Sequence, residues 1–121
     1  MFELSKQFSF EAAHTLRRNI DAAPSRRIHG HSYSAEVTVR GARDENGMVL
    51  DLGHFARAID AAREQLDHHF LDEVAGLGPA TIENLAAWIW QTVAPACPGL
   101  VRVAVWREST GDRCNYFGPG P

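Results

Sequence analysis

The chain has 121 residues, 45% of them hydrophobic, and a formal net charge of −3 at pH 7. This length holds one hydrophobic core, and the weak negative charge argues against a general nucleic-acid or membrane binder. No apolar run approaches the ~20 residues needed to cross a bilayer. We therefore expect a single domain over residues 1–121, with neither nucleic acid nor membrane as its partner.

The N-terminal residues and the cysteine content indicate a cellular compartment. Residues 1–6 lack the charged segment and apolar core of a secretory signal. The two cysteines, Cys97 and Cys114, are too few for a framework of disulfides. We expect a cytoplasmic protein whose cysteines are inert core or loop thiols.

Two segments of alternating polarity predict two strands in the first third of the chain. Even positions are mostly apolar over residues 2–14, and odd positions are histidine or apolar over residues 29–39. Side chains two residues apart in a strand point to the same face. Because His14, His29 and His31 all lie on the apolar parity, we expect them on the same covered face of a strand pair.

These three histidines predict a metal site. His29 and His31 present two imidazoles on one wall, and His14 is the candidate for a third ligand. Three protein ligands with an open fourth position are typical of catalytic zinc. The alternative for a His-x-His pair is an accident of the surface or core, and the shared parity of all three favours the metal. Three imidazoles would also accept other divalent ions.

Helical patterns occupy the middle of the chain. Residues 15–27, rich in arginine, read as a loop. Apolar residues then recur at helical spacing over residues 55–66 and again over residues 82–93. Thr81 is placed to cap the start of the second helix.

The last two strands complete an α+β pattern. Residues 100–108 and 113–117 are rich in β-formers. The order strand, strand, helix, helix, strand, strand predicts a four-stranded, mainly antiparallel sheet with both helices on one face. The strand over residues 100–108 is apolar at both parities, which predicts burial on both sides. Association of subunits would cover the second face.

Several short motifs stand in a fixed order along the chain. They are FEAAH at residues 10–14, HGH at 29–31, LDH at 66–68, PATIEN at 79–84, and Glu108 near a closing Tyr116. In this order they resemble the family of 6-pyruvoyl-tetrahydropterin synthase and its bacterial relative 6-carboxy-tetrahydropterin synthase. Each motif alone is weak, but the match runs over nearly the whole chain.

The resemblance implies a tunnelling fold, in which subunits join their sheets into an oligomeric barrel as a homotrimer or a pair of trimers. It implies Zn²⁺ held by His14, His29 and His31. It also implies lyase chemistry on the side chain of a pterin, with a substrate like dihydroneopterin triphosphate, as in queuosine or deazapurine biosynthesis. A metal ion there would polarise the side-chain oxygens of the substrate and acidify neighbouring C–H bonds.

The resemblance also implies roles for single residues. Glu108 matches the glutamate that anchors the pterin, and a carboxylate can accept from several ring donors together. Asp67 and His68 match a relay pair, in which the carboxylate orients an imidazole that exchanges a proton. The alternative for this pair is a helix end stabilised by histidine. Thr81 and Glu83 match a segment for which structural support is expected first and pocket lining second.

Four arginines, Arg17, Arg18, Arg26 and Arg27, flank the expected site. They could bind a triphosphate, although solvated loop charges are an equal alternative. His54 is expected on a helix surface.

One position departs from the family pattern. The family places a catalytic cysteine four residues before the first histidine of His-Gly-His, where this chain has Ser25. A serine hydroxyl is much less acidic than a thiol, so Ser25 would need His68 and Asp67 to take its proton during the reaction. Cys114 is a less favoured replacement for the thiol.

Three functions follow from this pattern. The first is a zinc-dependent pterin enzyme with altered or reduced chemistry, for example retro-aldol trimming of the side chain. The second is a zinc- and pterin-binding homologue without catalysis. The third, a structural zinc protein, is disfavoured because an open metal position makes a poor structural site. The presence of Asp67, His68 and Glu108 favours the enzyme, and the missing thiol favours the non-catalytic homologue.

Overall fold

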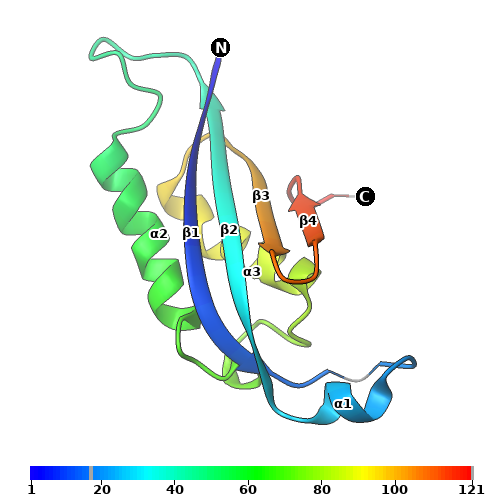
Figure 1. The fold of residues 1–121 in the computed structure, drawn as a ribbon. Helices are drawn as coiled ribbons and strands as arrows, with labels where there is room; N and C mark the ends of the chain where they lie inside the picture. The colour runs from blue at the N-terminus through cyan, green and yellow to red at the C-terminus, as the bar shows by residue number, and fades with distance from the viewer. Residues whose placement is uncertain (17, 121) are drawn as a thin grey trace.

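The computed structural model describes residues 1–16 and 18–120. Its elements in chain order are β1 (Phe2–His14), α1 (Ala22–Arg26), β2 (His29–Gly41), α2 (Leu52–Leu66), η1 (Leu71–Glu73), α3 (Ile82–Val93), η2 (Ala94–Ala96), β3 (Leu100–Arg107) and β4 (Asp112–Tyr116). The four strands form one antiparallel sheet in the order β1-β2-β3-β4. The predicted fold class is therefore confirmed (Figure 1).

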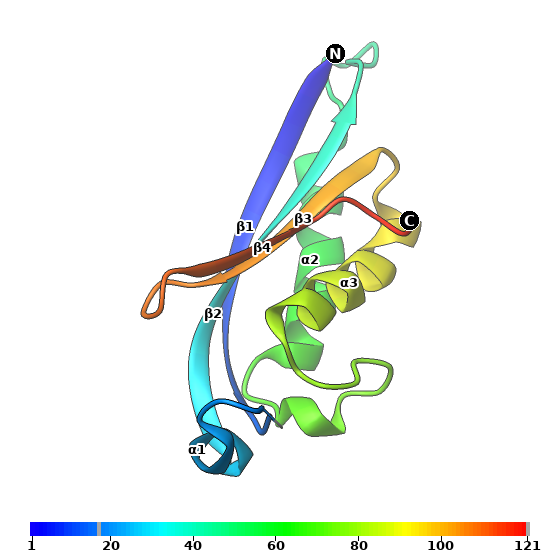
Figure 2. The same cartoon turned by 90° about the vertical axis from the view of Figure 1, so that its right-hand side faces the viewer.

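Both long helices cover the same face of the sheet, which Figure 2 shows edge-on. Helix α2 packs against β1, and α3 packs against β3 and β4. Buried apolar residues of α2 and α3 recur every three or four positions, as the helical pattern predicts. The core lies between this helical layer and the sheet, and none of the described helices combines the length and apolar surface needed to cross a membrane.

Side-chain caps start both long helices. The Asp51 carboxylate accepts hydrogen bonds from the backbone N–H groups of Gly53 and His54 at the start of α2. The Thr81 hydroxyl accepts from the backbone N–H of Asn84, at 3.1 Å, at the start of α3. Each cap satisfies N–H groups that have no partner within the helix, and the prediction for Thr81 is confirmed.

The expectation of a loop over residues 15–27 is wrong in part, because α1 lies within it. Its Pro24 stands in the first turn of the helix, where a backbone N–H has no intrahelical partner and proline is tolerated. The backbone N–H of Ser25 donates to the carbonyl of Asp21 at 3.1 Å. Proline, read as a loop signal, here stands in the first turn of a short helix that follows the end of β1.

The predicted two-sided burial of β3 holds for the middle of the strand. Val103 and Val105 are buried beneath the helices, and Ala104 is buried on the opposite face. Val101 and Trp106, towards the two ends, are only half-buried. On the face away from the helices, Arg102 pairs with the neighbouring strand, so polar side chains cover this face within one chain.

Candidate metal centre and its cavity

The register of β1 and β2 brings three histidines to one point. His14 pairs with His29 across the two strands, and His31 follows two residues later on β2. One ring nitrogen from each side chain lies within 4.8 Å of the others. His14 is fully buried, while His29 and His31 are half-buried. The three histidines therefore share the helix-covered face, as their parity predicts.

Backbone carbonyls orient two of these rings. Nδ1 of His14 donates to the carbonyl of Ala80 at 2.9 Å, and Nδ1 of His29 donates to the carbonyl of Arg27 at 2.7 Å. Each ring then presents the lone pair of Nε2. A carbonyl on the second nitrogen is the usual way to orient a metal-ligating histidine.

The Nε2 atom of His14 is buried and has no hydrogen-bond partner among the described residues. A buried polar atom without a partner is costly, and native proteins rarely contain one. A metal ion bound by the three imidazoles would satisfy it. The donor set of three neutral nitrogens with room for a further ligand fits Zn²⁺.

Burial keeps two of the three rings in the form that binds metal. It lowers the pKa of His14. Burial, with the positive charge of Arg107 as the next cause, lowers the pKa of His31 to about 4. Both imidazoles are therefore neutral at pH 7, and a metal ion displaces no proton from either of them.

Arg107 is a residue of this site that sequence reasoning missed. Its Nη1 donates to Nε2 of His31 at 3.2 Å, and its Nη2 lies 3.0 Å from Oδ2 of Asp112. A metal ion that binds Nε2 of His31 has to displace Nη1, whereas the contact with Asp112 is independent of His31. The signal in the sequence is parity, because Arg107 continues the inward-facing positions of Val103 and Val105 with a charge.

A cavity of about 910 Å³ opens beside the histidines. Its wall includes His14, Tyr33, Thr81, Glu83 and Arg107. Pockets of ~300–1,000 Å³ commonly hold small organic ligands. Thr81 thus both caps α3 and lines the cavity, and Glu83 stands in the first turn of the same helix. Burial raises the pKa of Tyr33 to about 12, so its hydroxyl remains a hydrogen-bond donor at neutral pH.

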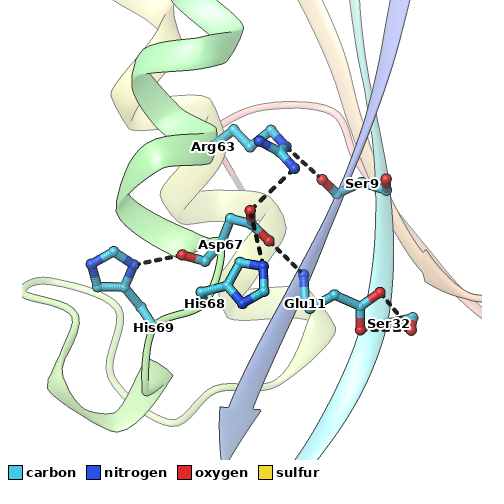
Figure 3. A network of polar contacts seen from close by, with 7 residues as sticks. All are labelled: Ser9, Glu11, Ser32, Arg63, Asp67, His68 and His69. Carbon is cyan, nitrogen blue, oxygen red and sulfur yellow. Dashed lines mark hydrogen bonds and ion pairs between the residues drawn. The ribbon is translucent and has the colours of Figure 1, made fainter.

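Asp67 and His68 follow directly after α2, beside the outer edge of β1 (Figure 3). Oδ1 of Asp67 accepts from the backbone N–H of Glu11 at 2.9 Å, and its Oδ2 lies 3.1 Å from Nη2 of Arg63. Nε2 of His68 is 3.7 Å from the same Oδ2. The Glu11 N–H is the main cause that lowers the pKa of Asp67, so the carboxylate beside the His68 ring is ionised at pH 7.

This pair stands beside the edge strand β1, and no described hydrogen bond joins it to the three histidines. His68 lines a second cavity of about 450 Å³, together with His31, Glu11 and Ser32. Glu11 and Ser32 have the parity opposite to His14 and His29, whereas His31 has the same parity, so this cavity lies at the edge of the metal site. The side chain of His68 is 79% exposed. Within one chain the predicted relay therefore shares a cavity with His31 but does not line the large cavity that holds His14.

Ser25 and Glu108 also lie apart from the large cavity. Ser25 is buried on α1, and among residues 1–16 and 18–120 no hydrogen bond joins it to Asp67 or His68. Glu108 is exposed in the turn after β3, where its carboxylate accepts from Nε1 of Trp106 at 2.9 Å. Neither side chain lines the wall that holds His14.

Some of the remaining predicted residues line the large cavity and others do not. Arg18 and Cys114 line the large cavity, whereas Arg26 and Arg27 do not, and Arg17 lies outside the described residues. Burial raises the pKa of Cys114, which disfavours it as a thiolate replacement. His54 is exposed on α2, and its Nε2 contacts the carbonyl of Ala96 at 2.7 Å.

Comparison with known proteins identifies the family. The family model for 6-pyruvoyl tetrahydropterin synthase matches residues 3–119. The chain belongs to this family. A 6-carboxy-5,6,7,8-tetrahydropterin synthase from Synechocystis is 37% identical over 126 aligned positions, which cover 98% of this chain and 95% of that protein. A dihydroneopterin monophosphate aldolase from Pyrococcus furiosus is 32% identical over 101 positions, covering 81% of this chain and 82% of that protein.

Solved structures of the family share the fold. The 6-pyruvoyl tetrahydropterin synthase of Caenorhabditis elegans superimposes with a TM-score of 0.82 at 23% identity, covering 98% of this chain and 96% of that one. The subunit fold expected from the motifs is therefore confirmed, and so is the resemblance on which the expectation rests. The relatives support chemistry on a pterin side chain as the common theme of the site.

Proposed function

We propose that this protein is a zinc-dependent enzyme that acts on the side chain of a dihydroneopterin phosphate. The observation that carries the proposal is the convergence of three imidazoles beside a cavity of about 910 Å³, with the buried Nε2 of His14 lacking a partner among the described residues. A synthase and an aldolase among the relatives, both named for pterin compounds, support this substrate class.

His14, His29 and His31 are the residues that would hold the zinc ion. When bound, the ion supplies a Lewis acid that polarises side-chain oxygens of the substrate and makes adjacent protons more acidic. The chain itself orients the ligands, since the carbonyls of Ala80 and Arg27 hold the rings of His14 and His29.

Retro-aldol cleavage is the reaction best suited to this set of residues. Elimination of a phosphate chain requires removal of a C–H proton, a task suited to the thiolate that Ser25 replaces. Retro-aldol cleavage instead begins with a hydroxyl proton, which is far easier for an imidazole to remove. This distinction favours a cleavage of the kind for which the Pyrococcus relative is named.

The cleavage balances without any further reactant. A base removes the proton of the 2′-hydroxyl, and a carbonyl forms at C2′ as the C1′–C2′ bond breaks. The electron pair of that bond moves into the C6–N5 imine of the dihydropterin ring, and C1′ then takes a proton. The products are a 6-hydroxymethyl dihydropterin and a two-carbon aldehyde that carries the phosphate.

The Asp67–His68 pair provides the base, and a second copy of the chain brings it to the cavity. Within one chain the pair does not line the large cavity that holds His14, and a neighbouring copy would bring its own pair there. Strands β1 and β4 stand at the two edges of the sheet and can pair with neighbouring copies. The functional unit is therefore a homo-oligomer, either a trimer or a pair of trimers.

The other predicted residues have supporting roles in this proposal. Glu108 lies outside the large cavity of its own chain, so in this proposal it reaches the pterin ring from a neighbouring copy and accepts from the N–H donors of the ring. Thr81 and Glu83 line the cavity near the start of α3. Ser25 stands where the family has its cysteine, and its weak acidity accounts for the altered chemistry. The second candidate function, a non-catalytic homologue that binds zinc and a pterin, is favoured by the same serine.

Product analysis distinguishes these functions. Zinc-loaded protein would be incubated separately with the triphosphate, the monophosphate and the dephosphorylated form of dihydroneopterin, and the products identified by mass. We expect a 6-hydroxymethyl dihydropterin. A product that keeps all three side-chain carbons would indicate elimination instead. Tight binding without reaction would support the non-catalytic homologue, and a failure to bind any of the three compounds would contradict the pterin assignment.

A further inference from the structure

Arg107 stands where the inward-facing side of β3 would be expected to continue with an apolar residue. Val103 and Val105, four and two positions before it, are fully buried beneath the helices. The Arg107 side chain is only 19% exposed. Burying most of a guanidinium costs free energy that an apolar side chain would not. Packing of β3 therefore gives no reason for an arginine at this position.

The guanidinium is fixed in place and still has free donors. Nη1 contacts His31 at 3.2 Å and Nη2 contacts Asp112 at 3.0 Å, while Nε is buried without a partner among the described residues. Arginine has five N–H donors in a planar fork. At least one further acceptor is needed to satisfy this side chain, and the group stands on the cavity wall.

The cavity wall carries arginines and carboxylates in equal number. Arg18 and Arg113 line the same cavity, and the guanidinium of Arg113 lies 4.5 Å from the ring centroid of Trp106. Three carboxylates also line it, Asp72, Asp112 and Glu83. Asp72 already accepts from the backbone and hydroxyl of Thr15, and Asp112 accepts from Arg107. The wall has no excess of positive charge, so the case for an anion rests on the unsatisfied donors of Arg107.

We propose that Arg107 binds the phosphate of the substrate next to the metal ligands, and so selects phosphorylated over dephosphorylated compounds. Guanidinium groups recognise phosphate through paired, charge-assisted hydrogen bonds. The contact with His31 places the bound phosphate near the point where the three imidazoles converge. The identity of the organic part of the ligand rests on the proposed function, whereas the anion site rests on Arg107 and its surroundings.

Calorimetry with two probes tests this assignment. Inorganic tripolyphosphate and dephosphorylated dihydroneopterin would be titrated into the zinc-loaded oligomer, and tripolyphosphate also into chelator-treated protein to separate binding by arginine from binding by the metal. The variants are Arg107→Gln, Arg107→Lys and, as a control, Arg40→Gln. Arg40 pairs with Glu3 at the opposite end of β1 and β2 and is 52% exposed.

We expect Arg107→Gln to weaken tripolyphosphate binding about ten-fold or more, in both zinc-loaded and chelator-treated protein, with unchanged affinity for dihydroneopterin. The affinity of Arg107→Lys for tripolyphosphate should lie between those of the wild type and Arg107→Gln. The affinity of Arg40→Gln should match that of the wild type. Wild-type affinity for tripolyphosphate in Arg107→Gln would overturn the proposal. So would loss of zinc from both Arg107 variants, because Arg107 would then support His31 only. Wild-type protein that binds tripolyphosphate but no dihydropterin would contradict the proposed function and leave the anion site standing.

Discussion

His14 and His29 are adjacent across two strands, yet each ring is fixed by a different backbone carbonyl. The carbonyl of Ala80 comes from the segment before α3, and that of Arg27 from the residue after α1. The ligand geometry therefore depends on the loops at the end of the sheet as well as on strand register. A site built in this way has its ring tautomers set before a metal arrives.

The low pKa of His31 predicts how the stability of metal-free protein depends on pH. Burial and the charge of Arg107 lower this pKa from the ordinary value of 6.5 to about 4. Between these values the unfolded chain binds more protons than the folded one, so the free energy of unfolding rises with pH. Stability should fall as pH drops from 6.5 towards 4, and His31→Gln should reduce this dependence. Urea denaturation of chelator-treated protein at pH 7, 6 and 5 would measure it, and an undiminished dependence in the variant would contradict the assignment.

Ser25 is the residue by which the chain departs from the family, so restoring the thiol tests its role. We expect Ser25→Cys to raise the yield of products that keep all side-chain carbons, because a thiolate is a better base for a C–H proton. Product masses from the triphosphate substrate would be compared with those of Ser25→Ala, which removes the hydroxyl without adding a thiol. If the cysteine and alanine variants give the same products, the residue at position 25 does not control the reaction.

At the scale of elements, a close backbone contact holds the segment between η2 and β3. Gly99 has φ of +80°, and a Cβ added there would lie 2.4 Å from the carbonyl oxygen of Arg40. The carbonyl of Gly99 in turn accepts from the backbone N–H of Arg40 at 2.8 Å. This contact joins the start of β3 to the end of β2, so it helps to fix the register of the central strands.

Two glycine substitutions separate the effect of this contact from backbone strain. Gly111 has a similar φ of +75° but no atom within 4 Å of an added Cβ. Gly111→Ala should therefore lose about 1–2 kcal/mol of stability from the left-handed conformation alone. Gly99→Ala should lose a further ~1–3 kcal/mol from the clash with β2. Equal losses in chemical denaturation would mean that the backbone moves aside without cost.

Periodicity was sufficient to predict the four strands, the two long helices and the shared face of the three histidines. Periodicity was insufficient where a residue occupies a position that is unusual for its type. Pro24 lies in the first turn of α1 although proline usually interrupts helices, and Arg107 faces inward although arginine is usually exposed. The position of His68 depends on its left-handed φ of 57° and on its backbone bond to Glu11, which links residues 57 positions apart. No local pattern contains that information.

At the scale of the whole molecule, the relay pair and His14 line different cavities of one chain. If a second copy completes each site, two variants that are inactive alone should restore activity together. His29→Ala loses the metal half and His68→Ala loses the relay half. Oligomers that mix both chains equally should recover about one quarter of wild-type activity, since each half is intact in half of the chains. Absence of recovery, with subunit exchange verified by native mass spectrometry, would show that each chain uses its own pair.

The dependence of turnover on zinc bound by the three histidines is the most direct test of the account. Zn²⁺ would be added stepwise to chelator-treated protein while product formation from dihydroneopterin phosphate is followed. We predict that activity rises in proportion to zinc and stops rising at one ion per chain. His29→Ala should neither retain zinc nor gain activity, whereas His54→Ala, on the exposed surface of α2, should behave as the wild type. Full activity before zinc is added, or a full metal complement in His29→Ala, would contradict the central claim.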